Sequence, residues 1–219
     1  MSVASAKPKP AARPNNQTPL IIGAIVGVAV LAAIVLIAVS GQASSNFSYD
    51  AFTPSRSSDG IFLLGDPNAP VTIIEFADYA CPACQQYYPE VTQFITEFVG
   101  SGQAAFEYRI FPTAGQQRTV FAGEIAACMG EDNPANFWTA LGRFNTLAQQ
   151  GRYDDAPRII AQELGLNYAD LLECQQSSTF VDDSVALGEQ LQVTGTPAVR
   201  IRYGDGAPTL ISWGGQTYD

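Results

Sequence analysis

The tetrapeptide Cys81-Pro82-Ala83-Cys84 lies where a strand-like pattern changes into a helical one, and this position constrains the fold strongly. The run before it, Val71 to Phe76, is rich in β-branched residues and favours a buried strand. The residues after it favour a helix from Cys84 to Val99, which Gly100 ends. The sequence therefore predicts two cysteines at a strand-to-helix junction. Pro82 suits the first helical position, where its missing N–H would have had no partner.

This position predicts redox chemistry for the cysteine pair. A sulfur at a helix N-terminus meets unpaired N–H groups that favour a thiolate, and the thiolate is the attacking species in disulfide exchange. We expect Cys81 to be the nucleophile and Cys84, one turn inward and more buried, to be the resolving thiol. The alternative is a structural or metal-binding pair.

Glu75, six residues before Cys81, is the candidate proton carrier. Near the end of a buried strand its carboxyl would be desolvated, with a raised pKa, and could relay a proton to or from the Cys84 thiol. The alternative is a strand-end residue that faces water. Asp78 and Tyr79 are expected to be loop residues at the rim of the site.

Charge and composition exclude several classes of function. The chain has 21 acidic and 11 basic residues, a net charge of −10, and no histidine. An acidic surface argues against nucleic-acid binding, which needs a basic footprint. The absence of histidine removes the commonest metal ligand and general base. We expect no cofactor and no metal.

The four cysteines form two candidate pairs, Cys81 with Cys84 and Cys128 with Cys174. An even count suits an oxidising compartment. A four-thiolate zinc site is the competing interpretation, but such a site usually has two closely spaced cysteine pairs. Two separate buried thiols are the alternative for Cys128 and Cys174.

The N-terminal part reads as a membrane anchor. Residues 1–19 carry three cations and no anion and should be a disordered cytoplasmic tail. The uncharged apolar run from Leu20 to Val39 is about 30 Å long as a helix, so we expect a transmembrane anchor over residues 20–40 with the rest of the chain outside the cytoplasm. A cleaved signal peptide is the alternative. Residues 41–59 read as a polar tether.

The remaining residues, 60–219, read as one domain of mixed α/β class with a helical insertion over about 116–192. Short strands are expected first, around the redox helix. Two strands follow the insertion and flank the Gly204-Asp205-Gly206 turn. The predicted strands are Ile61–Leu64, Val71–Phe76, Ala105–Phe111, Ala198–Tyr203 and Pro208–Trp213. The insertion is expected to be helical from its start, because Phe121, Ile125 and Cys128 recur at spacings of three and four. The further helices predicted in it are Pro134–Gln150, Ala156–Leu164, Tyr168–Gln175 and Phe180–Leu191. Phe137, Trp138, Leu141 and Phe144 recur at helical spacing and are expected in the core.

Together these residues resemble the DsbA-like branch of the thioredoxin superfamily, over roughly Gly60 to Trp213. The resemblance is carried by the segments Leu64–Val71, Glu75–Cys84, Asn136–Trp138 and Thr194–Pro197, and by Cys128. It implies a thioredoxin-like fold with a helical insertion and an extracytoplasmic thiol-disulfide oxidoreductase that acts on protein thiols. A membrane enzyme of the DsbB or VKOR type would be the reoxidant.

The resemblance also implies roles for individual residues. Cys81 would be the exposed nucleophile, Cys84 its partner and Pro197 a cis proline beside the disulfide, with Thr196 offering backbone groups to substrate. A bond between Cys128 and Cys174 would match the second disulfide of some members.

Two departures from the family pattern leave other functions open. Ala83 stands where strongly oxidising members often carry histidine, so a reductase or isomerase is one alternative. The family fold ends with a helix on the sheet, and we expect this helix to be missing after Trp213-Gly214-Gly215. A membrane-tethered structural subunit of a larger complex, which uses the redox fold as a scaffold, is therefore a second alternative.

Overall fold

The computed structural model describes residues 47–57, 59–213 and 216–218. This part of the chain contains seven strands and six α-helices. The strands are β1 (Pro54–Arg56), β2 (Phe62–Leu64), β3 (Val71–Ala77), β4 (Ala104–Ile110), β5 (Ala198–Tyr203), β6 (Thr209–Trp213) and β7 (Gln216–Tyr218). The helices are α2 (Pro82–Phe94), α3 (Gln117–Met129), α4 (Pro134–Gln149), α5 (Ala156–Glu163), α6 (Tyr168–Gln175) and α7 (Phe180–Gln190).

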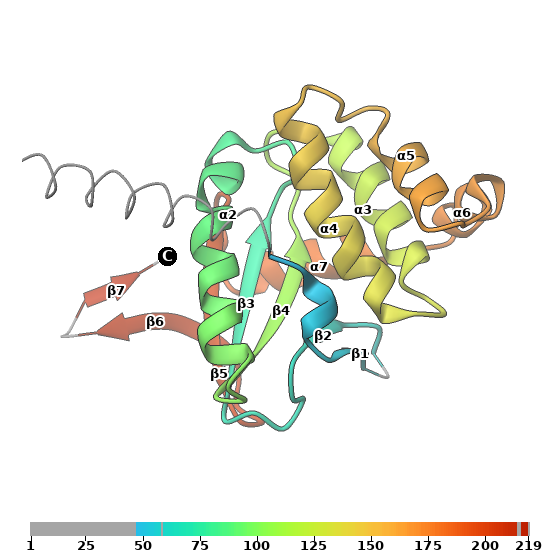
Figure 1. Cartoon of the computed structure of the whole chain (residues 1–219). Coiled ribbons are helices and arrows are strands. Elements are labelled where there is room, and N and C mark those ends of the chain that lie inside the picture. Colours follow the sequence, from blue (N-terminus) through green and yellow to red (C-terminus); the bar gives the residue numbers. More distant parts are fainter. Residues whose placement is uncertain (1–46, 58, 214–215, 219) are drawn as a thin grey trace, which may run out of the picture. The chain divides into compact units, whose positions relative to one another are not determined.

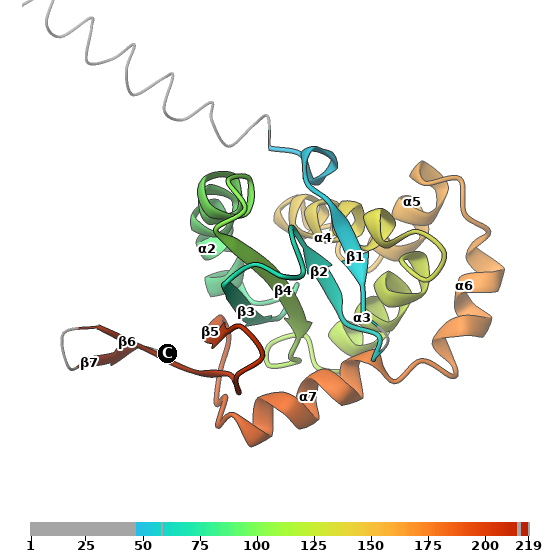
Figure 2. The same ribbon diagram turned by 90° about the horizontal axis from the view of Figure 1, so that it is seen from below.

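The strands form one sheet with the order β1-β2-β4-β3-β5-β6-β7. Only the β3–β4 pair is parallel among the strand pairs described, and α2 makes the crossover between those two strands. Helix α7 lies on the opposite side of the sheet from α2 and α4 (Figures 1 and 2). The result is the expected thioredoxin-like arrangement with helices inserted between β4 and β5.

Pleating gives β3 two different faces. Ile74 and Phe76 point to the α7 side, where they form a small cluster with Val193 and Ala198. Glu75 and Ala77 point to the α2 side because side chains alternate along a strand. The second half of β3 therefore directs a carboxyl toward the redox helix.

The main core lies between the sheet and the helical insertion. Phe137, Trp138 and Phe144 are fully buried on α4, which confirms the prediction that these aromatic residues pack in the core. Phe137 stacks on Phe62 of β2 with ring centroids 4.0 Å apart. Burial of such rings supplies much of the hydrophobic stabilisation of the domain.

The redox helix begins before the predicted range of Cys84–Val99, and Pro82 occupies its first position as expected. Cys81 is its N-cap and Pro82 is its first residue. After Phe94 the helix continues as a π-helical turn over Ile95–Val99. Pro89 lies inside α2 and lacks the N–H that would complete the hydrogen-bond ladder.

The folded unit begins at Phe47, so the prediction of a tether up to residue 59 is wrong for its last part. Residues 54–56 form β1, which pairs with β2. Tyr49 is buried, and its ring lies 5.5 Å from that of Trp138. The segment has a polar composition, but it is folded because β1 pairs with β2 and because Tyr49 packs in the core.

The chain after the insertion matches the predicted strands β5 and β6, whereas the sequence pattern does not predict the short strand β7. Strand β7 pairs antiparallel with β6. Among the described residues, no helix is both long and apolar enough to cross a membrane. The predicted anchor over residues 20–40 lies outside the described residues, as do the predicted tail and the first part of the tether.

Candidate redox site

The end of β3 and the start of α2 place the two cysteines. The Cys81 backbone N–H donates to the Asp78 carbonyl at 3.0 Å, which closes a tight turn before the helix. Cys81 has extended backbone angles, as is usual for an N-cap, and its sulfur therefore lies at the helix entrance. Both cysteines are free thiols.

Electrostatics, rather than exposure, distinguishes the two sulfurs. Both side chains are buried, with 8% of Cys81 and 9% of Cys84 exposed. Burial nevertheless penalises the charged form more strongly at Cys84, as expected for the inner thiol. Burial raises the pKa of Cys81, but hydrogen bonds from the Cys84 N–H, the Thr196 hydroxyl and the Ala83 N–H outweigh it and bring this pKa below its usual value. Burial raises the pKa of Cys84 to about 12. Of the two sulfurs, Cys81 is therefore the one that ionises more readily.

The loop before β5 lies against this pair. The peptide bond between Thr196 and Pro197 is cis. The Cys81 thiol donates to the Thr196 carbonyl, with the sulfur 3.4 Å from the oxygen. The structure thus brings the Thr196–Pro197 loop and the Cys81–Cys84 pair together across 115 residues of sequence.

Glu75 is 4% exposed, on the α2 side of β3. Burial raises its pKa to about 8, so the carboxyl is mostly protonated at neutral pH. It lines a small cavity of about 20 Å³ together with Cys84, Tyr49, Tyr88 and Tyr108. A cavity of this size is large enough for one water molecule.

Asp78 and Tyr79 are not at the rim, contrary to expectation. Asp78 is fully buried, and Tyr79 is 4% exposed. The Asp78 carboxylate accepts hydrogen bonds from three backbone N–H groups, those of Thr113, Ala114 and Gly115, at 2.7–2.9 Å. Those partners come more than 30 residues later in the sequence, and no local pattern identifies them.

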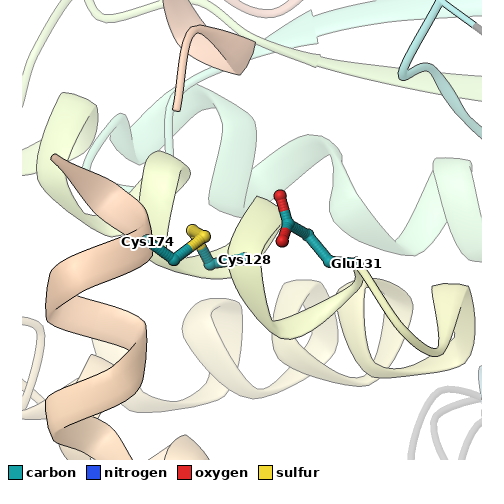
Figure 3. Close-up of side chains that lie close together, drawn as sticks. All are labelled: Cys128, Glu131 and Cys174. Carbon is teal, nitrogen blue, oxygen red and sulfur yellow. A yellow bond between two sulfur atoms is a disulfide. The ribbon is translucent and has the colours of Figure 1, made fainter. Parts of the chain in front are cut away.

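Cys128 and Cys174 are bonded as a disulfide that joins α3 to α6 (Figure 3). Glu131 lies beside them, within the separation that metal ligands would need. Disulfide sulfurs are not thiolates, however, and the Glu131 carboxylate lies 4.0 Å from the Arg56 guanidinium. A four-thiolate zinc site that uses all four cysteines is therefore excluded.

The fold and the site together define a class of protein: a thioredoxin-like domain with a two-cysteine centre at a helix N-terminus. A family model described as thioredoxin matches residues 57–204. The chain belongs to this family.

Its relatives by sequence include disulfide bond formation proteins. The chain is 31% identical over 92 residues to disulfide bond formation protein D of Bacillus subtilis, a match that covers 41% of this chain and 40% of that one. A probable disulfide bond formation protein D of Bacillus anthracis is 30% identical over 105 residues, which cover 48% of this chain and 46% of that one. The chain thus spans less than half the length of these curated relatives.

Solved structures show the same fold at lower identity. Oxidised BdbD from Bacillus subtilis superposes with a TM-score of 0.56 at 21% identity, covering 68% of this chain and 84% of that chain. The α-DsbA1 protein of Wolbachia pipientis gives a TM-score of 0.53 at 23% identity, with 68% of this chain and 78% of that chain covered.

Proposed function

We propose that this protein is a thiol-disulfide oxidoreductase that exchanges disulfides with protein thiols through Cys81 and Cys84. The observation that carries the proposal is the place of Cys81 at the N-cap of α2, with its sulfur 3.4 Å from the carbonyl oxygen of Thr196 in the cis Thr196–Pro197 bond. The opposite directions of the Cys81 and Cys84 pKa shifts support it. A stabilised thiolate makes Cys81 the better leaving group when the mixed disulfide is resolved. Its place at the N-cap of α2, rather than its pKa, makes Cys81 the sulfur that partners attack. The names of the Bacillus relatives support disulfide formation as the net direction.

The oxidising half-reaction uses each residue in turn. A substrate thiolate attacks the Cys81 sulfur of the Cys81–Cys84 disulfide, a mixed disulfide forms, and Cys84 leaves as a thiolate. With its pKa of about 12, this thiolate takes up a proton. Glu75, protonated at neutral pH, is the nearby acid, and one water in the shared cavity would pass the proton to the Cys84 sulfur.

The second step releases the product. Another substrate thiolate attacks the substrate sulfur of the mixed disulfide and expels the Cys81 thiolate. The substrate gains a disulfide and the protein is left with two thiols, so the electron pair ends on Cys81 and Cys84. Reoxidation needs an acceptor, for which we propose a membrane enzyme of the DsbB or VKOR type.

We also propose that the protein is held in the cell membrane by residues 20–40. The tail over residues 1–19 would be cytoplasmic, and the redox domain would face the outside. The proposal rests on the apolar run and on the three cations before it. An oxidising compartment suits the Cys128–Cys174 disulfide.

A trapping experiment tests the roles of the two cysteines. We expect Cys84→Ser to accumulate mixed disulfides with substrate proteins, because nothing remains to resolve the bond from within. We expect Cys81→Ser to form none. Non-reducing gels and mass spectrometry of the captured adducts provide the measurement. Trapping by Cys81→Ser, but not by Cys84→Ser, would reverse the assignment.

A further inference from the structure

The buried carboxylate of Asp78 ties three active-site segments together. One oxygen accepts from the Ala80 N–H at 2.7 Å and from the Thr119 hydroxyl. The other accepts the three N–H groups of the turn at residues 113–115. The turn comes so close that a Cβ on Gly115 would lie 2.8 Å from the Ala80 Cβ. Asp78 therefore fixes the turn at 113–115 against the residues that lead into Cys81.

A hydrogen bond between two threonines joins this turn to the cis-proline loop. The Thr113 hydroxyl lies 2.6 Å from the Thr196 hydroxyl. The Thr196 carbonyl in turn accepts a hydrogen bond from the Cys81 thiol. The Thr196 hydroxyl is among the groups that lower the pKa of Cys81 and of Cys84, and of these two sulfurs Cys81 is the one that ionises more readily. On the other side, the Asp78 backbone N–H donates to the Cys84 sulfur. A continuous path of contacts thus runs from one redox sulfur to the other, through Asp78, Thr113 and Thr196.

A threonine hydroxyl has one hydrogen and can donate only one good hydrogen bond. If Thr196 donates to Thr113, that hydrogen is no longer available to Cys81. If Thr113 donates instead, the Thr196 hydrogen is free to point at the Cys81 sulfur, and the two bonds strengthen each other. The sulfur is best stabilised when Thr113 is the donor.

We propose that Asp78 and Thr113 are positioning residues that direct the Thr196 hydroxyl toward the Cys81 sulfur, and we call this pair the Asp78–Thr113 brace. This inference rests on the proposed redox function of Cys81 and Cys84. The brace stabilises the reduced protein, because a better hydrogen bond favours the thiolate that only the reduced form contains. It thereby makes the disulfide a stronger oxidant.

Other ionisable groups around the site must stay unchanged in a test of the brace. On α2, Cys84 faces Cys81. On β3, Glu75 shares the small cavity with Cys84, as do Tyr79, Tyr88, Tyr108 and Tyr49 from the surrounding elements. Thr113→Val alters none of these groups and removes only the hydroxyl, from a side chain that is exposed in a loop.

The test is a double-mutant cycle with Thr113→Val and Thr196→Val in the full chain. Two readouts are the pKa of Cys81, from thiolate absorbance against pH, and the equilibrium constant of the Cys81–Cys84 pair with glutathione. We expect Thr113→Val to raise this pKa and to make the disulfide about three- to tenfold less oxidising, a fraction of what a full hydrogen bond to a charged group contributes. When Thr196 is already valine, Thr113→Val should change the equilibrium constant with glutathione by less than about twofold.

The matched control is Thr139→Val. This threonine donates to the Ala135 carbonyl at 3.0 Å within α4, so its loss removes a hydroxyl away from the site. It should leave both readouts unchanged.

The outcomes separate the brace from the proposed function. If the wild-type pair does not equilibrate with glutathione, the proposed function fails. If the wild-type pair does equilibrate, two results would contradict the brace. In the first, Thr113→Val changes neither the Cys81 pKa nor the equilibrium constant. In the second, it changes them equally with and without the Thr196 hydroxyl.

Discussion

Glu75 links the stability of this protein to pH. Its pKa is about 8 in the folded state, against 4.5 for an ordinary glutamate, because burial penalises the charged form. Between these values the unfolded chain releases this proton and the folded protein keeps it. Stability should therefore fall as the pH rises from 4.5 to 8, by up to about 1.4 kcal/mol per pH unit from this group.

We predict that Glu75→Gln removes this slope, because glutamine does not titrate. Chemical denaturation of the reduced protein at several pH values gives the measurement, and subtracting the two curves cancels the contribution of every other group. Glu90→Gln is the control, since it removes an exposed carboxyl from α2. Parallel curves for wild type and Glu75→Gln would show that the carboxyl is already ionised at neutral pH.

The residues of the site differ in how far the sequence identifies them. Cys81, Cys84 and Thr196–Pro197 lie in short motifs, so they can be assigned without coordinates. Asp78 cannot be assigned from the sequence, because its hydrogen-bond partners belong to a turn that only the fold brings near it. A carboxylate after a strand usually faces water, and only the pattern of donors around it shows otherwise.

At the scale of elements, the sequence predicts the start of a helix well where capping residues mark it. Helix α4 begins after Asn133, whose side chain caps it, with Pro134 at its first position, so its start is visible in the sequence. Strand β1 has no such signal: its three residues are ordered by pairing with β2. The predicted boundary at residue 60 is therefore too late, because tertiary pairing determines it.

The Cys128–Cys174 disulfide makes a prediction about the helical insertion. It joins α3 to α6 across a sequence separation of 46 residues. We predict that the double substitution of both cysteines by alanine lowers the free energy of unfolding by about 2–4 kcal/mol, because the unfolded chain regains the entropy of an open loop. Urea denaturation with Cys81 and Cys84 kept oxidised measures this loss. If the midpoint and slope of the urea denaturation curve do not change, the disulfide does not stabilise the helical insertion.

At the scale of the whole molecule, charge is distributed very unevenly along the chain. Lys7, Lys9 and Arg13 are the only charged residues before the apolar run, whereas all 21 acidic residues follow it. Cationic flanks stay in the cytoplasm, so this asymmetry favours one orientation of a spanning helix. It also gives the redox domain an acidic character, which suits cationic substrate proteins better than nucleic acid.

We predict that protease added to intact spheroplasts removes the redox domain and leaves a fragment that contains residues 1–40 in the membrane. The physical reason is that residues 20–40 would span the bilayer once, with the cations retained inside. Immunoblots with antibodies to the domain and to the tail give the measurement, and a cytoplasmic protein that stays uncut shows that the cells are sealed. A cleaved signal peptide would instead release the whole domain from the membrane fraction before any protease is added. Full protection of the domain in sealed cells, followed by digestion after lysis, would place the redox site in the cytoplasm and overturn the proposed topology.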